Sequence, residues 1–299
     1  MKQIFLLPKL ASIFFLVGLM SLTSCKKDNN TTNTDNPDPA LSVDAVQSDD
    51  NAASQFEDVF NITMGVQSSD AGEDIGLGTG GNIIYRTDGT ASPDTRCFTV
   101  TVVPKILHEF PKTVTWDFGN GCVGKDGKLR SGKIVTIFTG PMLVPGSKAS
   151  TSFINYNVDS FKIEGTHTIE NKSTSNHFAW QVNIINGKIT NTQTNKWVEW
   201  STVRNHEQIK GNGSPFYSLD NVYQITGSSE GSKSNGNSWT SEITQPVIRK
   251  FTCIWRVKGE ITFSRNSNTK TAVLDYGDGS CDDQATVTLN GKSYVITLH

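Results

Sequence analysis

The stretch Phe161-Lys162-Ile163-Glu164-Gly165-Thr166-His167-Thr168-Ile169 alternates between two kinds of side chain with a period of two. One face is mostly apolar and the other is polar: Phe161, Ile163, Gly165, His167 and Ile169 against Lys162, Glu164, Thr166 and Thr168. Alternation of this kind predicts an antiparallel strand with one face in the core and the other in water. Because His167 falls on the apolar face, we expect it in the core rather than at a metal.

The same pattern recurs on both sides of this stretch, for example from Phe178 to Ile184 and from Cys253 to Phe263, where Arg256, Lys258 and Glu260 fall on the polar face. Tight-turn dipeptides separate the runs, and Asn-Gly and Asp-Gly tolerate the positive φ angles of hairpins. They are Asp88-Gly89, Asn120-Gly121, Asp126-Gly127, Asn186-Gly187, Asn235-Gly236, Asp278-Gly279 and Asn290-Gly291. We therefore predict a mainly β fold, an antiparallel meander over 96–299 that forms a sandwich or an open barrel.

One helix is predicted, over 44–66, within an N-terminal helix-and-loop segment at 41–95. Its apolar residues fall near helical spacing and predict packing on the sheet. They are Val46, Ala53, Phe56, Val59, Phe60 and Met64. We expect the acids Asp49, Asp50, Glu57 and Asp58 on the other faces. The alternative is a helix that binds a partner or a membrane surface, and the acidic face argues against anionic lipid.

Two segments, 97–140 and 253–298, share a pattern that suggests an internal duplication. Each holds one cysteine before a strand and a second after an Asp-aromatic-Gly turn: Cys97 and Cys122, then Cys253 and Cys281. Four cysteines outside the cytoplasm predict two disulfides, with four free thiols as the alternative. The repeat selects Cys97–Cys122 and Cys253–Cys281, and pairing between the copies remains open. The absence of close cysteine pairs disfavours zinc.

The N-terminus predicts a membrane address. Lys2 and Lys9 precede an apolar run from Leu10 to Leu22, which is too short for a stable membrane span. Leu22-Thr23-Ser24-Cys25 then resembles the lipobox of bacterial lipoproteins. The resemblance implies a signal peptide at 1–24, removal of that peptide, and acyl chains such as palmitate on Cys25. A single transmembrane anchor is the alternative. Residues 25–40, which hold no apolar side chain between Cys25 and Ala40, are expected to form a disordered tether.

Sorting signals and a family resemblance refine this address. Lys26 stands where lipoproteins kept in the inner membrane carry Asp, and Lys27-Asp28 partly resembles the export signal of Bacteroidetes surface lipoproteins. The chain from 117 to 277, through Arg130-Ser131-Gly132-Lys133 and Val222 to Gly227, resembles uncharacterised Bacteroidetes lipoproteins. The resemblance implies an outer-membrane lipoprotein, with surface exposure as a further expectation, and it implies no known activity.

Two sets of residues are candidates for ligand binding. Four carboxylates could hold Ca²⁺, which takes six to eight oxygen ligands, although a polar hairpin turn would use the same residues. They are Asp275, Asp278, Asp282 and Asp283. Three tryptophans, Trp197, Trp200 and Trp239, would bind a glycan if they formed an exposed row. Alternation places Trp197 with Glu199 on one face and Trp200 on the other, which favours one exposed ring and one in the core.

No catalytic motif stands out, and no cofactor is expected. The formal charge is −2, from 27 basic and 29 acidic residues, without a basic patch, so nucleic-acid binding is not expected. We expect a lipid-anchored envelope protein with a binding or structural role, whose partners are the membrane, through the lipid on Cys25, and a glycan or an envelope protein. The alternatives are an extracellular polysaccharide hydrolase, which requires two carboxylates in a cleft, and a lipid carrier, which requires an apolar cavity.

Overall fold

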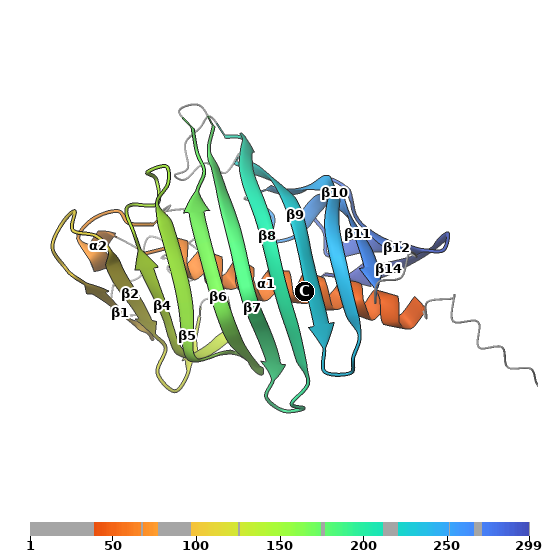
Figure 1. Cartoon of the computed structure of the whole chain (residues 1–299), viewed down its shortest axis with the longest axis horizontal. Coiled ribbons are helices and arrows are strands. Elements are labelled where there is room, and N and C mark those ends of the chain that lie inside the picture. Colours follow the sequence, from red (N-terminus) through yellow and green to blue (C-terminus); the bar gives the residue numbers. More distant parts are fainter. Residues whose placement is uncertain are drawn as a thin grey trace, which may run out of the picture. The chain divides into compact units, whose positions relative to one another are not determined.

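The computed structural model describes residues 39–66, 68–76, 97–124, 126–174, 177–211, 221–250, 252–265 and 271–298 (Figure 1). The predicted leader, Cys25 and the tether up to residue 38 lie outside these ranges. Two helices precede the strands: α1 (Pro39–Met64) and α2 (Ser68–Ala71). The strands are β1 (Thr99–Val103), β2 (Lys112–Asp117), β3 (Cys122–Val123), β4 (Leu129–Phe138), β5 (Lys148–Val158), β6 (Phe161–Asn171), β7 (Ala179–Asn191), β8 (Trp197–Lys210), β9 (Val222–Lys233), β10 (Ser238–Lys250), β11 (Arg256–Arg265), β12 (Thr271–Asp278), β13 (Gln284–Leu289) and β14 (Lys292–Thr297).

The strands form one open antiparallel sheet of 14 strands. Each long strand pairs with the next along the chain, from β1 at one edge to β14 at the other, and the short β3 pairs with β4. The predicted antiparallel meander is therefore confirmed. Of the two expected arrangements, the sheet is the open one, since the strands make a single layer rather than two packed sheets.

Helix α1 packs on one face of this sheet and runs across the strands (Figure 1). It contacts β8, β11, β12 and β13, and Asp58 near its C-terminal end reaches Arg130 of β4. The six apolar residues that predicted the helix are all buried, with exposed fractions of 9% or less. The predicted helix is confirmed, but it begins at Pro39, five residues before the predicted start and within the segment predicted as a tether, and it ends at Met64.

A line of backbone irregularities crosses the sheet from β4 to β12. Register shifts occur in most pairs along this line, and glycines at positive φ mark it: Gly132, Gly165, Gly227, Gly259 and Gly277. At Gly132 and at Gly227 an added Cβ would lie 2.1 Å from a carbonyl oxygen of a neighbouring strand, so only glycine fits. Bulges and glycines inside strands bend a sheet. Here they lie along one line across the sheet on which α1 packs.

The structure contains two disulfides, one toward each end of the sheet. Cys97–Cys122 joins the segment before β1 to β3, and Cys253–Cys281 joins the β10–β11 connection to the β12–β13 connection. This is the pairing that the internal repeat predicts. The two turns before the second cysteines also share a local structure: Asp117 accepts a hydrogen bond from Gly119 N at 2.9 Å, and Asp275 accepts one from Gly277 N at 2.8 Å. In both turns the residue between, Phe118 or Tyr276, is buried.

Candidate functional site

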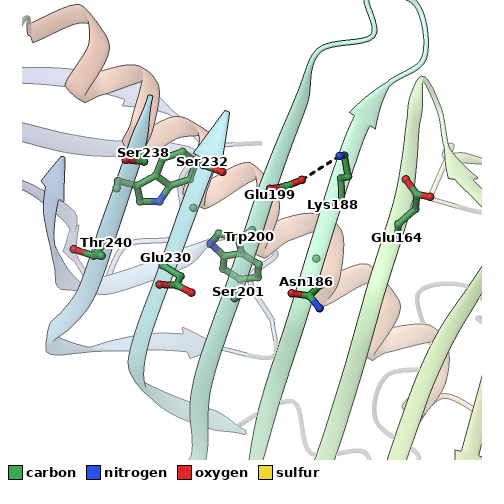
Figure 2. Close-up of a pocket in the computed structure, with 13 residues that line it drawn as sticks. Glu164, Asn186, Lys188, Glu199, Trp200, Ser201, Glu230, Ser232, Ser238 and Thr240 are labelled. Atoms are coloured by element: carbon green, nitrogen blue, oxygen red, sulfur yellow. Dashed lines mark hydrogen bonds and ion pairs between the residues drawn. The ribbon is translucent and has the colours of Figure 1, made fainter. Parts of the chain in front are cut away.

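A hollow of about 830 Å³ lies over the middle of the sheet, across β6 to β10 (Figure 2). No residue of α1 lines it, and the outward-pointing side chains of five strands do. We call it the outer groove. Its lining side chains on this face are Glu164, Asn186, Lys188, Glu199, Ser201, Glu230, Ser232, Ser238 and Thr240.

The strand register arranges these side chains in rows. Glu164 lies opposite Lys188, Lys188 opposite Glu199, Glu199 opposite Ser232 and Ser232 opposite Ser238. At about 4.8 Å between strands, this first row is about 19 Å long. A second row runs beside it through Ser201, Glu230 and Thr240. The groove therefore presents an extended set of polar groups that runs across the strands rather than along them.

Charges in the outer groove are partly paired. Lys188 Nζ lies 3.0 Å from Glu199 Oε1, as Figure 2 shows, and Lys162 Nζ lies 2.7 Å from Glu164 Oε1. Glu230 is exposed. All three glutamates can accept further hydrogen bonds, because an ionised carboxylate offers about four acceptor positions.

The three candidate tryptophans do not form an exposed row, which corrects the glycan-binding arrangement considered from the sequence. Trp197 is half-buried on the outer face, where Lys188 Nζ lies 4.6 Å from its ring centre. Trp200 and Trp239 are each 2% exposed. Their indole nitrogens donate to Asp49 of α1 at 2.7 and 3.0 Å. Trp200 and Trp239 still line the outer groove although they are buried, whereas Trp197 lies on the same face next to Lys188 and is not a lining residue.

The four candidate calcium ligands lie around the turn between β12 and β13. Asp275, Asp278 and Asp282 each accept a hydrogen bond from the backbone N–H two residues ahead, at 2.8, 2.9 and 3.0 Å. The N–H of Ser280 lowers the pKa of Asp278. Among the described residues, no group of three or more His, Cys, Asp or Glu is arranged to hold a metal ion. Asp275, Asp278 and Asp282 therefore have the contacts of a polar hairpin turn.

The acids of α1 face the sheet, contrary to the expectation that they lie on its other faces. Asp49 lies 3.4 Å from Arg204, Asp50 lies 2.7 Å from Arg256, and Asp58 lies 2.6 Å from Arg130. Glu57 pairs with Arg249 and Arg256, and Asp44 with Lys233 at 2.6 Å. The helix therefore buries its apolar stripe and most of its acids together. Arg130, Arg204 and Arg256 lie in three different strands, so no local pattern in the sequence marks them as the partners of these acids.

The position of Arg256 also differs from the one that the sequence predicts. Strict alternation places it on the polar face with Lys258, but a register shift between β10 and β11 falls at this point. The guanidinium consequently turns toward Asp50, which also accepts a hydrogen bond from the hydroxyl of Tyr276 at 3.0 Å. Burial raises the pKa of Tyr276, and the negative charge of Asp50 raises it further.

Among the described residues, no helix is both long and apolar enough to span a membrane. Comparison of the chain with protein-family models, with curated proteins and with solved structures finds no match.

Proposed function

We propose that this protein is a lipid-anchored, non-enzymatic binding module of the cell envelope, and that its outer groove binds a glycan. The observation that carries the proposal is the cross-strand row from Glu164 to Ser238, which presents carboxylates, an ammonium and hydroxyls in one extended hollow. Such groups pair with the hydroxyls of a sugar chain. Trp197 lies on the same face and offers an apolar ring to a sugar.

The membrane address rests on the sequence of the N-terminus. The apolar run up to Leu22 and the small residues before Cys25 favour acylation of that cysteine. Two or more acyl chains anchor a protein stably, at about 0.8 kcal/mol per buried methylene. Placement in the outer membrane, with the domain at the cell surface, follows from Lys26 and Lys27-Asp28 and forms part of the same proposal.

A binding assay on a glycan array, followed by titration of the best glycan, tests the ligand. Glu199→Gln and Trp197→Ala should each weaken binding, and loss of a hydrogen bond to a charged group predicts about tenfold for the first. Glu242→Gln is the matched control, because Glu242 is an exposed acid of β10 outside the groove. Equal binding by all variants would contradict a glycan site in the outer groove.

The anchor is tested separately by metabolic labelling with palmitate. Label is expected on the natural chain and not on Cys25→Ser, and the variant should leave the membrane fraction. An unlabelled natural chain in the cytosol would contradict the envelope address while leaving the groove assay intact.

One observation favours polysaccharide hydrolysis as a second candidate. Glu230 lies on the strand next to Glu199 and is displaced by two residues along it. Diagonal neighbours of this kind have Cα atoms roughly 7–8 Å apart, and paired acids of glycosidases are separated by roughly 5–10 Å. Release of reducing ends by the natural chain, lost in both Glu199→Gln and Glu230→Gln, would support this activity over simple binding.

The lipid-carrier alternative finds less support. The hollow between α1 and the sheet has a volume of about 40 Å³, which has room for a few water molecules at most. An acyl chain would require α1 to leave the sheet, together with its ion pairs.

A further inference from the structure

A second hollow lies between α1 and the inner face of the sheet, apart from the outer groove. Its volume is about 40 Å³. Phe56, Glu57 and Phe60 of α1 line one side, and apolar residues of β7 and β9 line part of the other. The wall also includes Trp200, Thr202 and four basic side chains: His167, Arg204, His206 and Arg256. We call this the inner hollow.

Hydrogen-bond donors outnumber acceptors around the inner hollow. Arg204 is 6% exposed and carries five N–H donors, but its contact with Asp49 is long, at 3.4 Å. The other oxygen of Asp49 already accepts three hydrogen bonds, from Trp200, Ser229 and Trp239. The aspartate is thus largely satisfied by other donors.

Several of these nitrogens have no partner among the described residues. Arg204 Nε and Arg256 Nε are buried without an acceptor, and so are both ring nitrogens of His167. His167 is fully buried and stacks on Phe56, with ring centres 6.4 Å apart. Buried polar atoms are nearly always hydrogen-bonded. A neutral imidazole has one N–H donor and one acceptor nitrogen. Three unpartnered donors, on His167, Arg204 and Arg256, therefore belong to residues that line one hollow, and they indicate that an acceptor belongs there.

Charges of both signs act on the side chains around the inner hollow. Burial lowers the pKa of Arg256, but Tyr276, Asp50 and Asp49 raise it overall. Burial lowers the pKa of His206 to about 3, and the positive charges of Arg204 and Arg256 lower it further. Burial also lowers the pKa of Arg204, against the attraction of Asp49. The carboxylate of Glu57 also lines the hollow, and it is paired with Arg249 and Arg256.

We propose that the inner hollow binds a small monovalent anion, chloride or a carboxylate of formate size, between Arg204, Arg256 and His167. A hollow of this volume takes an ion of about one to three heavy atoms. Such an ion accepts hydrogen bonds and donates none, which matches the excess of donors. Its binding would fix α1 on the sheet, because α1 forms one wall of the site.

The test uses the full-length chain purified in detergent. Its melting temperature is measured in chloride, bromide or formate, against gluconate, at constant ionic strength. A ligand that binds only the folded state raises the melting temperature with its concentration. We expect a saturable increase in melting temperature with the small anions and none with gluconate. The anion that gives the larger increase, chloride or formate, is the one that the site prefers. Bromide should also give an anomalous peak between α1 and β8 in a crystal.

Two variants locate the response. Ala53 lines the inner hollow on α1, so Ala53→Leu should fill the hollow without altering a charge and remove the anion-dependent increase. Arg204→Gln should remove it by deleting donors. Arg249→Gln is the matched control, since Arg249 pairs with Glu57 but does not line the hollow, and it should keep the response.

Two results would overturn the proposal. One is an identical melting temperature of the natural chain in all four salts. The other is a saturable response that persists in folded Ala53→Leu, which would place the anion elsewhere. If Arg204→Gln does not fold, the Ala53→Leu and Arg249→Gln pair still decides the location.

Discussion

Trp200 of β8 donates its indole N–H to Oδ1 of Asp49 in α1 at 2.7 Å, across a separation of 151 residues along the chain. Trp239 of β10 and Ser229 of β9 donate to the same oxygen at 3.0 and 2.6 Å. One carboxylate of the helix thus collects donors from three neighbouring strands. It fixes the position of α1 on the sheet, beneath the region that carries the outer groove on its other face.

Asp49→Ala should therefore be strongly destabilising. The substitution leaves Arg204 and two indole nitrogens without their acceptor inside the protein, while the Ser229 hydroxyl keeps Ser241 as a partner. Breaking a buried ion pair in this way costs about 3–5 kcal/mol of unfolding free energy. Urea denaturation measures the change. Glu242→Gln, on the exposed face of β10, should stay within about 0.5 kcal/mol of the natural chain. A similar small effect for Asp49→Ala would show that the helix does not depend on this carboxylate.

The bend of the sheet gives a second prediction. A Cβ added at Gly227 would lie 2.1 Å from Val203 O, at a φ of 128°. Gly236 has a φ of 84°, and nothing lies within 4 Å of the same added atom. Both substitutions by alanine carry backbone strain of about 1–3 kcal/mol, and only Gly227→Ala adds a clash. Gly227→Ala should lower the midpoint of urea unfolding clearly more than Gly236→Ala. Equal effects of the two substitutions would mean that β8 and β9 can move apart at Gly227 at little cost in free energy.

The sequence predicts the strands well because most of them alternate, and the helix because its apolar residues repeat at helical spacing. It does not predict where the acids of α1 lie. Asp49 and Asp58 read as a solvated face unless the partners Arg204 and Arg130 are known to point inward, and those partners are 155 and 72 residues away. Long-range pairing of charges leaves no local pattern.

The outer groove is also hidden from the sequence, and for a different reason. Glu164, Lys188 and Glu199 become neighbours only through the register of three strands, and two register shifts in those strands set that register. The sequence does contain a similar mid-strand glycine in Ile163-Glu164-Gly165 and in Ile225-Thr226-Gly227. Its cause, a bend that crosses neighbouring strands, became evident only from the structure.

The disulfides predict a third measurable effect. Cys97–Cys122 and Cys253–Cys281 close loops with sequence separations of 25 and 28 residues. In the chain-entropy account, each should stabilise the folded state by about 3.5 kcal/mol. Paired Cys97→Ser and Cys122→Ser substitutions should lower the unfolding free energy by that amount, as should the equivalent pair at 253 and 281. Peptide mapping without reduction checks which cysteines are paired. A disulfide that joins Cys97 or Cys122 to Cys253 or Cys281 would contradict the predicted pairing.

As the pH falls, the protein should begin to lose stability at pH values above the range in which exposed carboxylates are protonated. Burial lowers the pKa of His167 to about 3, whereas an exposed histidine titrates near 6.5. The unfolded chain therefore binds a proton first as the pH falls, and the stability present above pH 6.5 is lost progressively toward pH 3. For His167 the loss is about 2 kcal/mol between pH 6.5 and 4.5, and His206 adds to it in the same direction.

His167→Phe isolates the contribution of one ring. Phenylalanine keeps an aromatic ring against Phe56 and has no titratable nitrogen, so the unfolding free energy of the variant should fall less steeply between pH 6.5 and 4.5. Urea titrations at several pH values measure the slope. His177→Phe is the control, because its side chain is 47% exposed beside Glu207, and removal of this ring should leave the acid-dependent loss in place. If the His167 variant keeps the full pH dependence, then the histidine is not the group whose burial opposes protonation, and the loss must come from His206 or from the ion pairs of α1.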